Sequence, residues 1–268
     1  MPTVTVHNFS YGILNPGIAY LLSCLGAFLG LRCITRARAH TGPAKAAWLI
    51  VASVAVGATG IWVMHFIAML GFTIPGQTML YSVPETLISM LLAVVVVGVG
   101  LFIVGYSDGG PLPILAGGVI IGIGVATMHY VGMNAMSMDD RQQYNVPLVA
   151  LSVLIAIVAG TAALWAGLRV KGLGSTIAAS LVMGVAVTGM HYTGMAAMRV
   201  YPGSGSMTMS GESAESFLLP LLLGVSIATF LMTLVIALSP SEDEIREDAS
   251  LSQRIRAGNN PRTIDSAR

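Results

Sequence analysis

The sequence Met-His-Tyr-Thr-Gly-Met at residues 190–195 lies near the end of an apolar run that is long enough to cross a membrane. Two similar segments precede it, Met-His-Phe-Ile-Ala-Met at residues 64–69 and Met-His-Tyr-Val-Gly-Met at residues 128–133. Three of the five histidines of the chain occupy the same place in this pattern. Imidazole and thioether are uncharged metal ligands, so the pattern indicates a candidate metal site inside a membrane.

The composition identifies the class of protein. Apolar residues make up 55% of the 268 residues and charged residues 9%, with a mean hydropathy of +0.80. A soluble domain carries about 25% charged residues, so this chain cannot cover its own surface in water. The net charge of +1 gives no indication of nucleic-acid binding. The lipid bilayer is therefore the expected environment of the chain.

Seven apolar runs approach or exceed the roughly 20 residues that a membrane-spanning helix needs. They lie at residues 12–34, 46–70, 84–105, 112–136, 146–168, 175–198 and 217–239. The prediction is an all-α polytopic membrane protein with seven transmembrane helices. Residues 1–11 are expected to form an external segment, residues 12–239 the membrane domain, and residues 240–268 a mostly disordered tail.

Lysine and arginine residues predict the orientation of the chain. When loops alternate between the two sides, eleven of these residues fall on one side and only Arg141 and Arg199 on the other. The positive-inside rule then places the N-terminus outside and the C-terminal tail in the cytoplasm.

The three histidines share one predicted depth. They lie on the second, fourth and sixth runs, which all cross from inside to outside, and each is a few residues before the outer end. His129 follows His65 by 64 residues and precedes His191 by 62 residues. This spacing predicts three repeats of a helical hairpin, with the seventh run left over.

Methionines and small residues recur at fixed offsets from each histidine. Methionine at +4 lies about 40° from the histidine on a helix, one turn farther out, and is the predicted companion ligand. The predicted metal ligands are His65, Met69, His129, Met133, His191 and Met195. The candidate additional ligands, at −1 and +7, are Met64, Met128, Met190, Met136 and Met198. Small residues at +3, Ala68, Gly132 and Gly194, would let the helices approach closely.

This donor set favours copper among the biological metals. Thioether and imidazole suit Cu(I), and imidazole alone suits Cu(II), whereas zinc sites more often contain cysteine or carboxylate. Haem held by two axial histidines or by histidine and methionine stays open. The alternative without metal is that the histidines bond across helices and the methionines fill the core. Cys24 and Cys33 are predicted to be small buried residues that form no disulfide.

The three motifs resemble those of the MHYT domain family, whose name spells residues 190–193. Phe66, Ile67 and Val131 depart from that pattern. The resemblance covers residues 12–239 and implies a sensory domain of the bacterial cytoplasmic (inner) membrane. It also implies copper bound through the His and Met residues, and sensing of oxygen, carbon monoxide or nitric oxide.

Many members of that family carry a cytoplasmic cyclic di-GMP synthase, phosphodiesterase or kinase domain. Only 30 residues follow Leu238 here. The expectation is a stand-alone domain that is not an enzyme, which signals through a cytoplasmic or membrane partner.

Two other functions stay open. A copper-handling protein, for delivery, storage or transport, is suggested by the outer-loop methionines Met79, Met138, Met207 and Met209. A copper-dependent membrane oxidase is less favoured, although Tyr130 and Tyr192 lie next to histidines.

Overall fold

Seven long apolar helices form the protein. The computed structural model describes residues 4–138, 140–202, 210–238 and 250–251. Within that part of the chain, seven helices are long and apolar enough to cross a membrane. They span Leu14–Ala39, Gly42–Met69, Val83–Gly105, Pro111–Asn134, Val146–Arg169, Leu173–Ala197 and Ala214–Ile236. The prediction of an all-α protein with seven such helices is confirmed; the predicted tail, residues 240–268, lies almost wholly outside the described residues.

Five of the seven are single α-helices, and the second and seventh contain π-helical segments. The single helices are α1 (Leu14–Ala39), α4 (Val83–Gly105), α5 (Pro111–Asn134), α6 (Val146–Arg169) and α7 (Leu173–Ala197). The second comprises α2 (Gly42–Val54), the π-helix η1 (Ala55–Val63) and α3 (Met64–Met69). The seventh comprises the π-helix η2 (Ala214–Leu218) and α8 (Leu219–Leu238). Proline occupies the first turn of α2, α4, α5 and α6, where its fixed φ suits a helix start.

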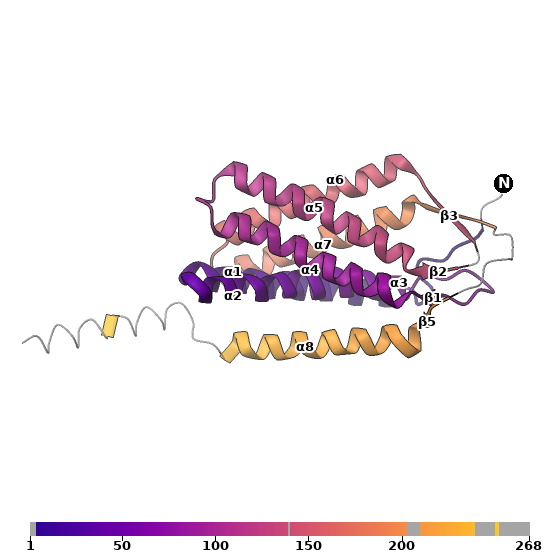
Figure 1. Ribbon diagram of the computed structural model, residues 1–268, viewed down its shortest axis with the longest axis horizontal. Helices are drawn as coiled ribbons and strands as arrows, with labels where there is room; N and C mark the ends of the chain where they lie inside the picture. Colours follow the sequence, from indigo (N-terminus) through magenta and orange to yellow (C-terminus); the bar gives the residue numbers. More distant parts are fainter. Residues whose placement is uncertain (1–3, 139, 203–209, 239–249, 252–268) are drawn as a thin grey trace, which may run out of the picture.

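The bundle has two chemically different ends (Figure 1). One end, here called the strand end, carries the short strands and the N-terminal segment. The opposite end, here called the tail end, contains the α1–α2 turn and the C-terminus of α6. Arg36, Arg38 and Arg169 lie in the last turns of α1 and α6 at the tail end. The basic residues of the α1 and α6 turns therefore gather at one end, as predicted, while the side of the membrane that this end faces stays a prediction.

Helix α1 extends to Ala39 rather than to residue 34 as predicted. Its two last-turn arginines bind the ends of other helices. The Arg36 guanidinium donates to the Ile236 carbonyl (2.6 Å), and Arg38 donates to the Leu168 carbonyl (2.8 Å). Carbonyls at a helix C-terminus lack intrahelical partners. The two arginines supply these partners and so tie the end of α1 to the ends of α8 and α6.

Five short strands cover the strand end and were not predicted. The strands β2 (Met136–Ser137), β1 (Leu80–Tyr81) and β5 (Glu212–Ser213) form an antiparallel sheet in that order. The strands β3 (Arg141–Tyr144) and β4 (Met198–Tyr201) form an antiparallel pair. Strands this short show no apolar alternation in sequence. Burial in this cover raises the pKa of Tyr81 to about 12.

The π-helix η1 lies in close contact with α1 and α4. A Cβ added to Gly57 would lie 2.8 Å from the Ala93 carbonyl oxygen of α4, and Gly26 of α1 packs directly on the Gly60 backbone. Trp62 is fully buried and donates from Nε1 to the Ser89 hydroxyl of α4 (3.0 Å). Small residues therefore let η1 occupy a narrow space beside the centre of the bundle.

Helix α8 lies along the flank of the bundle beside η1 and α1 (Figure 1). Its interior contact includes a buried hydroxyl pair, Thr59 Oγ1 of η1 and Thr229 Oγ1 of α8, 2.6 Å apart. Large apolar side chains such as Leu223 and Phe230 are exposed on its other face. An exposed apolar face is expected for a helix at the edge of a bundle in lipid.

Candidate metal centre

The three motif histidines meet in the interior of the bundle. His65 of α3, His129 of α5 and His191 of α7 are at most 1% exposed. Each pair of rings has a centroid distance of 5.0 Å and a nearly perpendicular arrangement. Side chains 126 residues apart thus form one compact cluster, here called the His triad.

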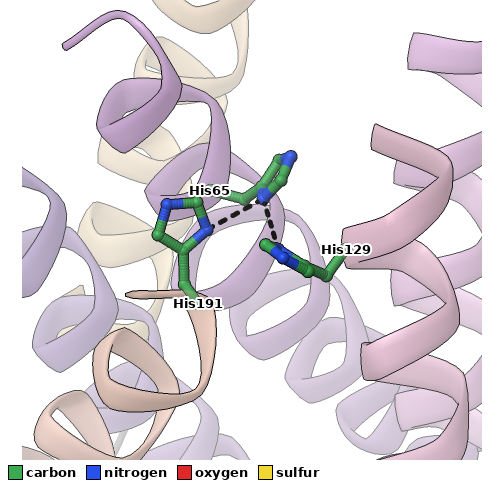
Figure 2. A group of neighbouring side chains, drawn as sticks. All are labelled: His65, His129 and His191. Carbon is green, nitrogen blue, oxygen red and sulfur yellow. Dashed lines mark hydrogen bonds between the residues drawn. The ribbon is translucent and has the colours of Figure 1, made fainter. Parts of the chain in front are cut away.

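The Nδ1 atoms of the His triad point toward one another. Nδ1 of His65 is 3.1 Å from Nδ1 of His191 and 3.1 Å from Nδ1 of His129 (Figure 2). The three Nε2 atoms are buried and have no hydrogen-bond partner among the described residues. The triad therefore gathers three nitrogens at its centre and turns three others outward.

Glycines on the neighbouring helices determine this orientation. A Cβ added to Gly132 of α5 would lie 2.5 Å from Nε2 of His65. A Cβ added to Gly194 of α7 would meet Nε2 of His129 even more closely. Each of these two histidine rings thus packs against the glycine at +3 of the next motif, where any side chain larger than hydrogen would clash with the ring.

Methionines form a layer on the strand-end side of the triad. Met69, Met133 and Met195 are each one helical turn beyond a histidine and at most 4% exposed. The structure therefore brings the predicted histidines together and buries the predicted companion methionines, which lie one helical turn farther along the same helices.

The residues of the triad fit a metal ion. Two nitrogen donors bound at about 2.0–2.1 Å to one ion in a tetrahedral or trigonal arrangement lie roughly 3.3–3.6 Å apart, close to the 3.1 Å found here. A ring nitrogen carries either a proton or a lone pair, so Nδ1 of His65 cannot pair fully with both neighbours through shared protons. A cation at the centre would satisfy all three lone pairs at once. Among the described residues, no cysteine or carboxylate joins these three histidines in the cluster.

The methionines at −1 serve different neighbours. Met64 packs with Ala19 and Ala68, and Met190 faces an interior cavity. Met128 is buried in the main core. These contacts agree with the expected 100° turn away from the histidine face.

The predicted helical position of the +7 methionines is wrong. Helix α5 ends at Asn134 and α7 at Ala197, so Met136 lies in β2 and Met198 begins β4. Helical offsets do not apply beyond a helix end, and the cover of strands takes up these side chains. Their role as metal ligands therefore has no helical basis.

The loop methionines are less available than the sequence suggested. Met138 is 6% exposed and Met79 packs against the core. Both therefore contribute to packing, while Met207 and Met209 lie outside the described residues.

The aromatic residue that follows each histidine packs against a different partner. The Tyr130 hydroxyl lies 2.8 Å from the Ser152 hydroxyl of α6. Tyr192 packs on Phe9 with a centroid distance of 5.3 Å, and Phe66 packs on Trp62 at 4.9 Å. Tyr192 and Phe66 therefore pack against aromatic neighbours, whereas Tyr130 also bonds a hydroxyl of α6. Cys24 and Cys33 are free and buried, as predicted.

Three segments of the chain match one family pattern. The pattern of MHYT, described as "Bacterial signalling protein N terminal repeat", matches residues 59–117, 122–180 and 184–245. The chain belongs to the MHYT family. The matched segments run from each motif helix through the next helix, so α1 rather than the seventh helix stands outside the three MHYT repeats. Together with the seven apolar helices, this membership makes the chain a multi-pass membrane protein.

Curated relatives with MHYT-like regions come from several bacteria. The bifunctional diguanylate cyclase/cyclic di-GMP phosphodiesterase MucR of Pseudomonas aeruginosa is 32% identical over 92% of this chain and 37% of its own length. The cyclic di-GMP phosphodiesterase NbdA of the same organism is 34% identical over 82% of this chain and 28% of its own length. Signaling protein YkoW of Bacillus subtilis is 31% identical over 67% of this chain and 23% of its own length. The chain thus spans well under half the length of these relatives, and no solved structure matches it.

Proposed function

We propose that this MHYT protein is a sensor of the bacterial inner membrane that binds copper at the His triad and responds to oxygen, carbon monoxide or nitric oxide. The observation that carries the proposal is the convergence of three buried Nδ1 atoms within one uncharged cluster. Neutral nitrogen donors with thioether sulfur nearby favour Cu(I) over zinc, calcium or magnesium.

Each part of the site has a role in this proposal. His65, His129 and His191 hold the ion, and Met69, Met133 and Met195 supply sulfur from the strand-end side. Gly132 and Gly194 fix the direction of the rings. The bound copper would supply a coordination position for a diatomic ligand, while the apolar surroundings exclude water from it.

Helix α8 offers a route from the triad to the C-terminal side. A single residue, Met64, separates His65 from the end of η1. The π-helix η1 in turn contacts α8 through the Thr59–Thr229 hydroxyl pair. At the tail end, α8 is held again by Arg36. A ligand that binds one arrangement of His65 more tightly would shift the position of α8, which a signalling partner at the tail end could read.

The membrane region itself is proposed to be non-enzymatic. The tyrosine hydroxyl beside His129 is bonded to Ser152, so Tyr130 gives the oxidase hypothesis no support. The names of MucR and NbdA favour second-messenger signalling as the type of output. The excess of Lys and Arg on the tail-end side supports a cytoplasmic tail end.

Copper delivery or transport has weaker support. A transport path needs donors through the thickness of the bundle, whereas the region on the tail-end side of the triad is lined by apolar residues, with Met183 and Met190 the sulfur-bearing exceptions. Met79 and Met138 also pack in the protein rather than lying free.

The test is the metal content of the purified protein. Protein bearing a tag without histidine is loaded with Cu(I), desalted and measured by plasma mass spectrometry. The triple variant His65→Ala/His129→Ala/His191→Ala should lose stoichiometric copper while it remains inserted and helical. The control His7→Ala/His40→Ala removes the two other histidines of the chain and should keep the metal. Equal copper in the triple variant and the control would overturn the proposal.

A further inference from the structure

An apolar cavity lies on the tail-end side of the His triad, about one helical turn from the histidines. Its volume is about 60 Å³. Ile61, Val125 and Val187 line it, and each of them precedes a motif histidine by four residues. The three helical segments that lead to the histidines thus each contribute an apolar residue to one common space on the tail-end side of the triad.

The lining of this cavity is apolar throughout. Helices α1, α4 and α6 complete the wall with residues such as Leu31, Val97 and Ala156. A buried water needs two to four polar partners, and none of the lining side chains is polar. An apolar cavity of this type stays dry and takes up apolar guests such as xenon. About one probe sphere of roughly 10–15 Å³ suffices for a water-sized molecule, so 60 Å³ accommodates a diatomic molecule with room to move.

Small residues on α6 bring the cavity close to the lipid. Ala159 and Ala163 line it and are only half-buried, and so are Met183 and Val187 on the adjacent helix α7. The cavity therefore reaches the seam between α6 and α7. Uncharged diatomic gases dissolve better in hydrocarbon than in water, so the bilayer is the richer source for a guest that enters here.

The two faces of the triad differ in chemistry. The strand-end side has three buried methionines, one from each motif. On the tail-end side Ile61, Val125 and Val187 are aliphatic, and Met183 and Met190 supply the sulfur atoms of the cavity wall. The cavity therefore offers an uncharged guest an almost wholly hydrocarbon surface on the tail-end side of the triad. We propose that this cavity is the docking site of a small uncharged diatomic gas, which enters from the bilayer between α6 and α7 and lies beneath the triad.

The docking part of this inference depends on the cavity alone, and its role in sensing rests on the proposed copper site. Xenon separates the two because it binds an apolar cavity without metal. Crystals of the metal-free full chain are pressurised with xenon and the anomalous signal is measured. The expected result is a xenon peak bounded by Val125, Val187 and Leu31. Absence of a peak there would overturn the docking site, whatever the copper content.

A matched pair of variants tests the location and the entry route. Ala163→Leu fills the cavity from α6 and should abolish the xenon peak. Ala162→Leu adds the same atoms at the next residue, which is exposed and does not line the cavity, and should retain the peak. Should Ala163→Leu fail to fold, Val187→Ile adds a single methyl group to the same space and should lower the xenon occupancy.

The copper-loaded proteins provide the functional readout. Ala163→Leu should slow carbon monoxide association with the reduced protein, followed by the infrared stretch of the bound gas, while its copper content equals that of Ala162→Leu. Unchanged association in a variant that has lost the xenon peak would overturn the entry route. If the wild-type protein bound no copper but still showed the xenon peak, the proposed function would be contradicted and the docking site would stand.

Discussion

The helix that leads to His65 differs from the helix that leads to His129, although the two motifs are nearly the same. The first is π-helical over Ala55–Val63, whereas α5 is α-helical from Pro111 through His129. Gly42 begins its helix 23 residues before His65, but Pro111 begins α5 only 18 residues before His129. The π-helical segment lies in the longer of these two helices, yet both histidines reach the same cluster.

This difference shows that the three repeats are not equivalent. The π-helical segment packs on α1, α4 and α8, and its hydroxyl Thr59 holds α8. π-Helical segments are rare and frequently occur at functional sites. Repetition of the motif therefore defines the triad, and the departure from repetition connects one histidine to the rest of the bundle.

Gly132→Ala is expected to have the largest effect on the triad. The new methyl group would lie 2.5 Å from His65 Nε2 and must displace that ring, so copper binding should be lost and stability should fall by about 1–3 kcal/mol. Copper content and thermal unfolding in detergent measure the two effects. Gly189→Ala is the control, because a methyl group there meets no atom within 4 Å. If Gly132→Ala kept full copper, the assigned ring orientation would be wrong.

Two glycines of η1 should respond differently to the same substitution. Gly57→Ala places a methyl group 2.8 Å from the Ala93 carbonyl oxygen, and backbone atoms cannot move aside easily, so we expect a loss of about 1–3 kcal/mol. Gly60→Ala meets its nearest atom at 3.4 Å and should be tolerated. Denaturation of both variants in one detergent makes the comparison. Equal stability would contradict the packing of η1 against α4.

The link between η1 and α8 should contribute a moderate energy. Thr59→Val and Thr229→Val each break the buried hydroxyl pair, and a double-mutant cycle should give a coupling of about 0.6 kcal/mol, up to about 1.7 kcal/mol, as for other bonds between membrane helices. Thr127→Val serves as a control because its hydroxyl bonds the carbonyl of Ile123 in its own helix. A coupling of zero would remove the proposed route from His65 to α8.

Methionine substitutions that keep the side-chain volume should have little effect on stability. Met69→Leu and Met64→Leu keep the volume, so each should cost less than about 1.5 kcal/mol. Met69→Leu should weaken Cu(I) binding because it removes sulfur from the layer beside the triad, while Met64→Leu should leave the affinity unchanged. Competition with a Cu(I) chelator measures both. Equal affinity of the two variants would argue against a role for the +4 methionines.

Much of the candidate site follows from periodicity. His65, His129 and His191 recur at one depth of three helices that cross in the same direction, and the 3.6-residue turn places Met69, Met133 and Met195 one turn beyond them. The limits of the prediction lie where the helix stops. Met136 and Met198 were assigned by the same turn and are found in strands, because the offsets hold only inside a continuous helix.

The sequence by itself determined the seven apolar helices, the common depth of the histidines and the gathering of basic residues at one end. These features depend on length, hydropathy and local periodicity, which each segment carries alone. The tertiary structure alone decided which ring nitrogens converge, which glycine each ring meets, where η1 widens and where a cavity remains. Those features depend on contacts such as Gly132 with His65 and Thr59 with Thr229, between residues far apart in the chain. No local pattern specifies such contacts, because each one depends on how two separate helices pack.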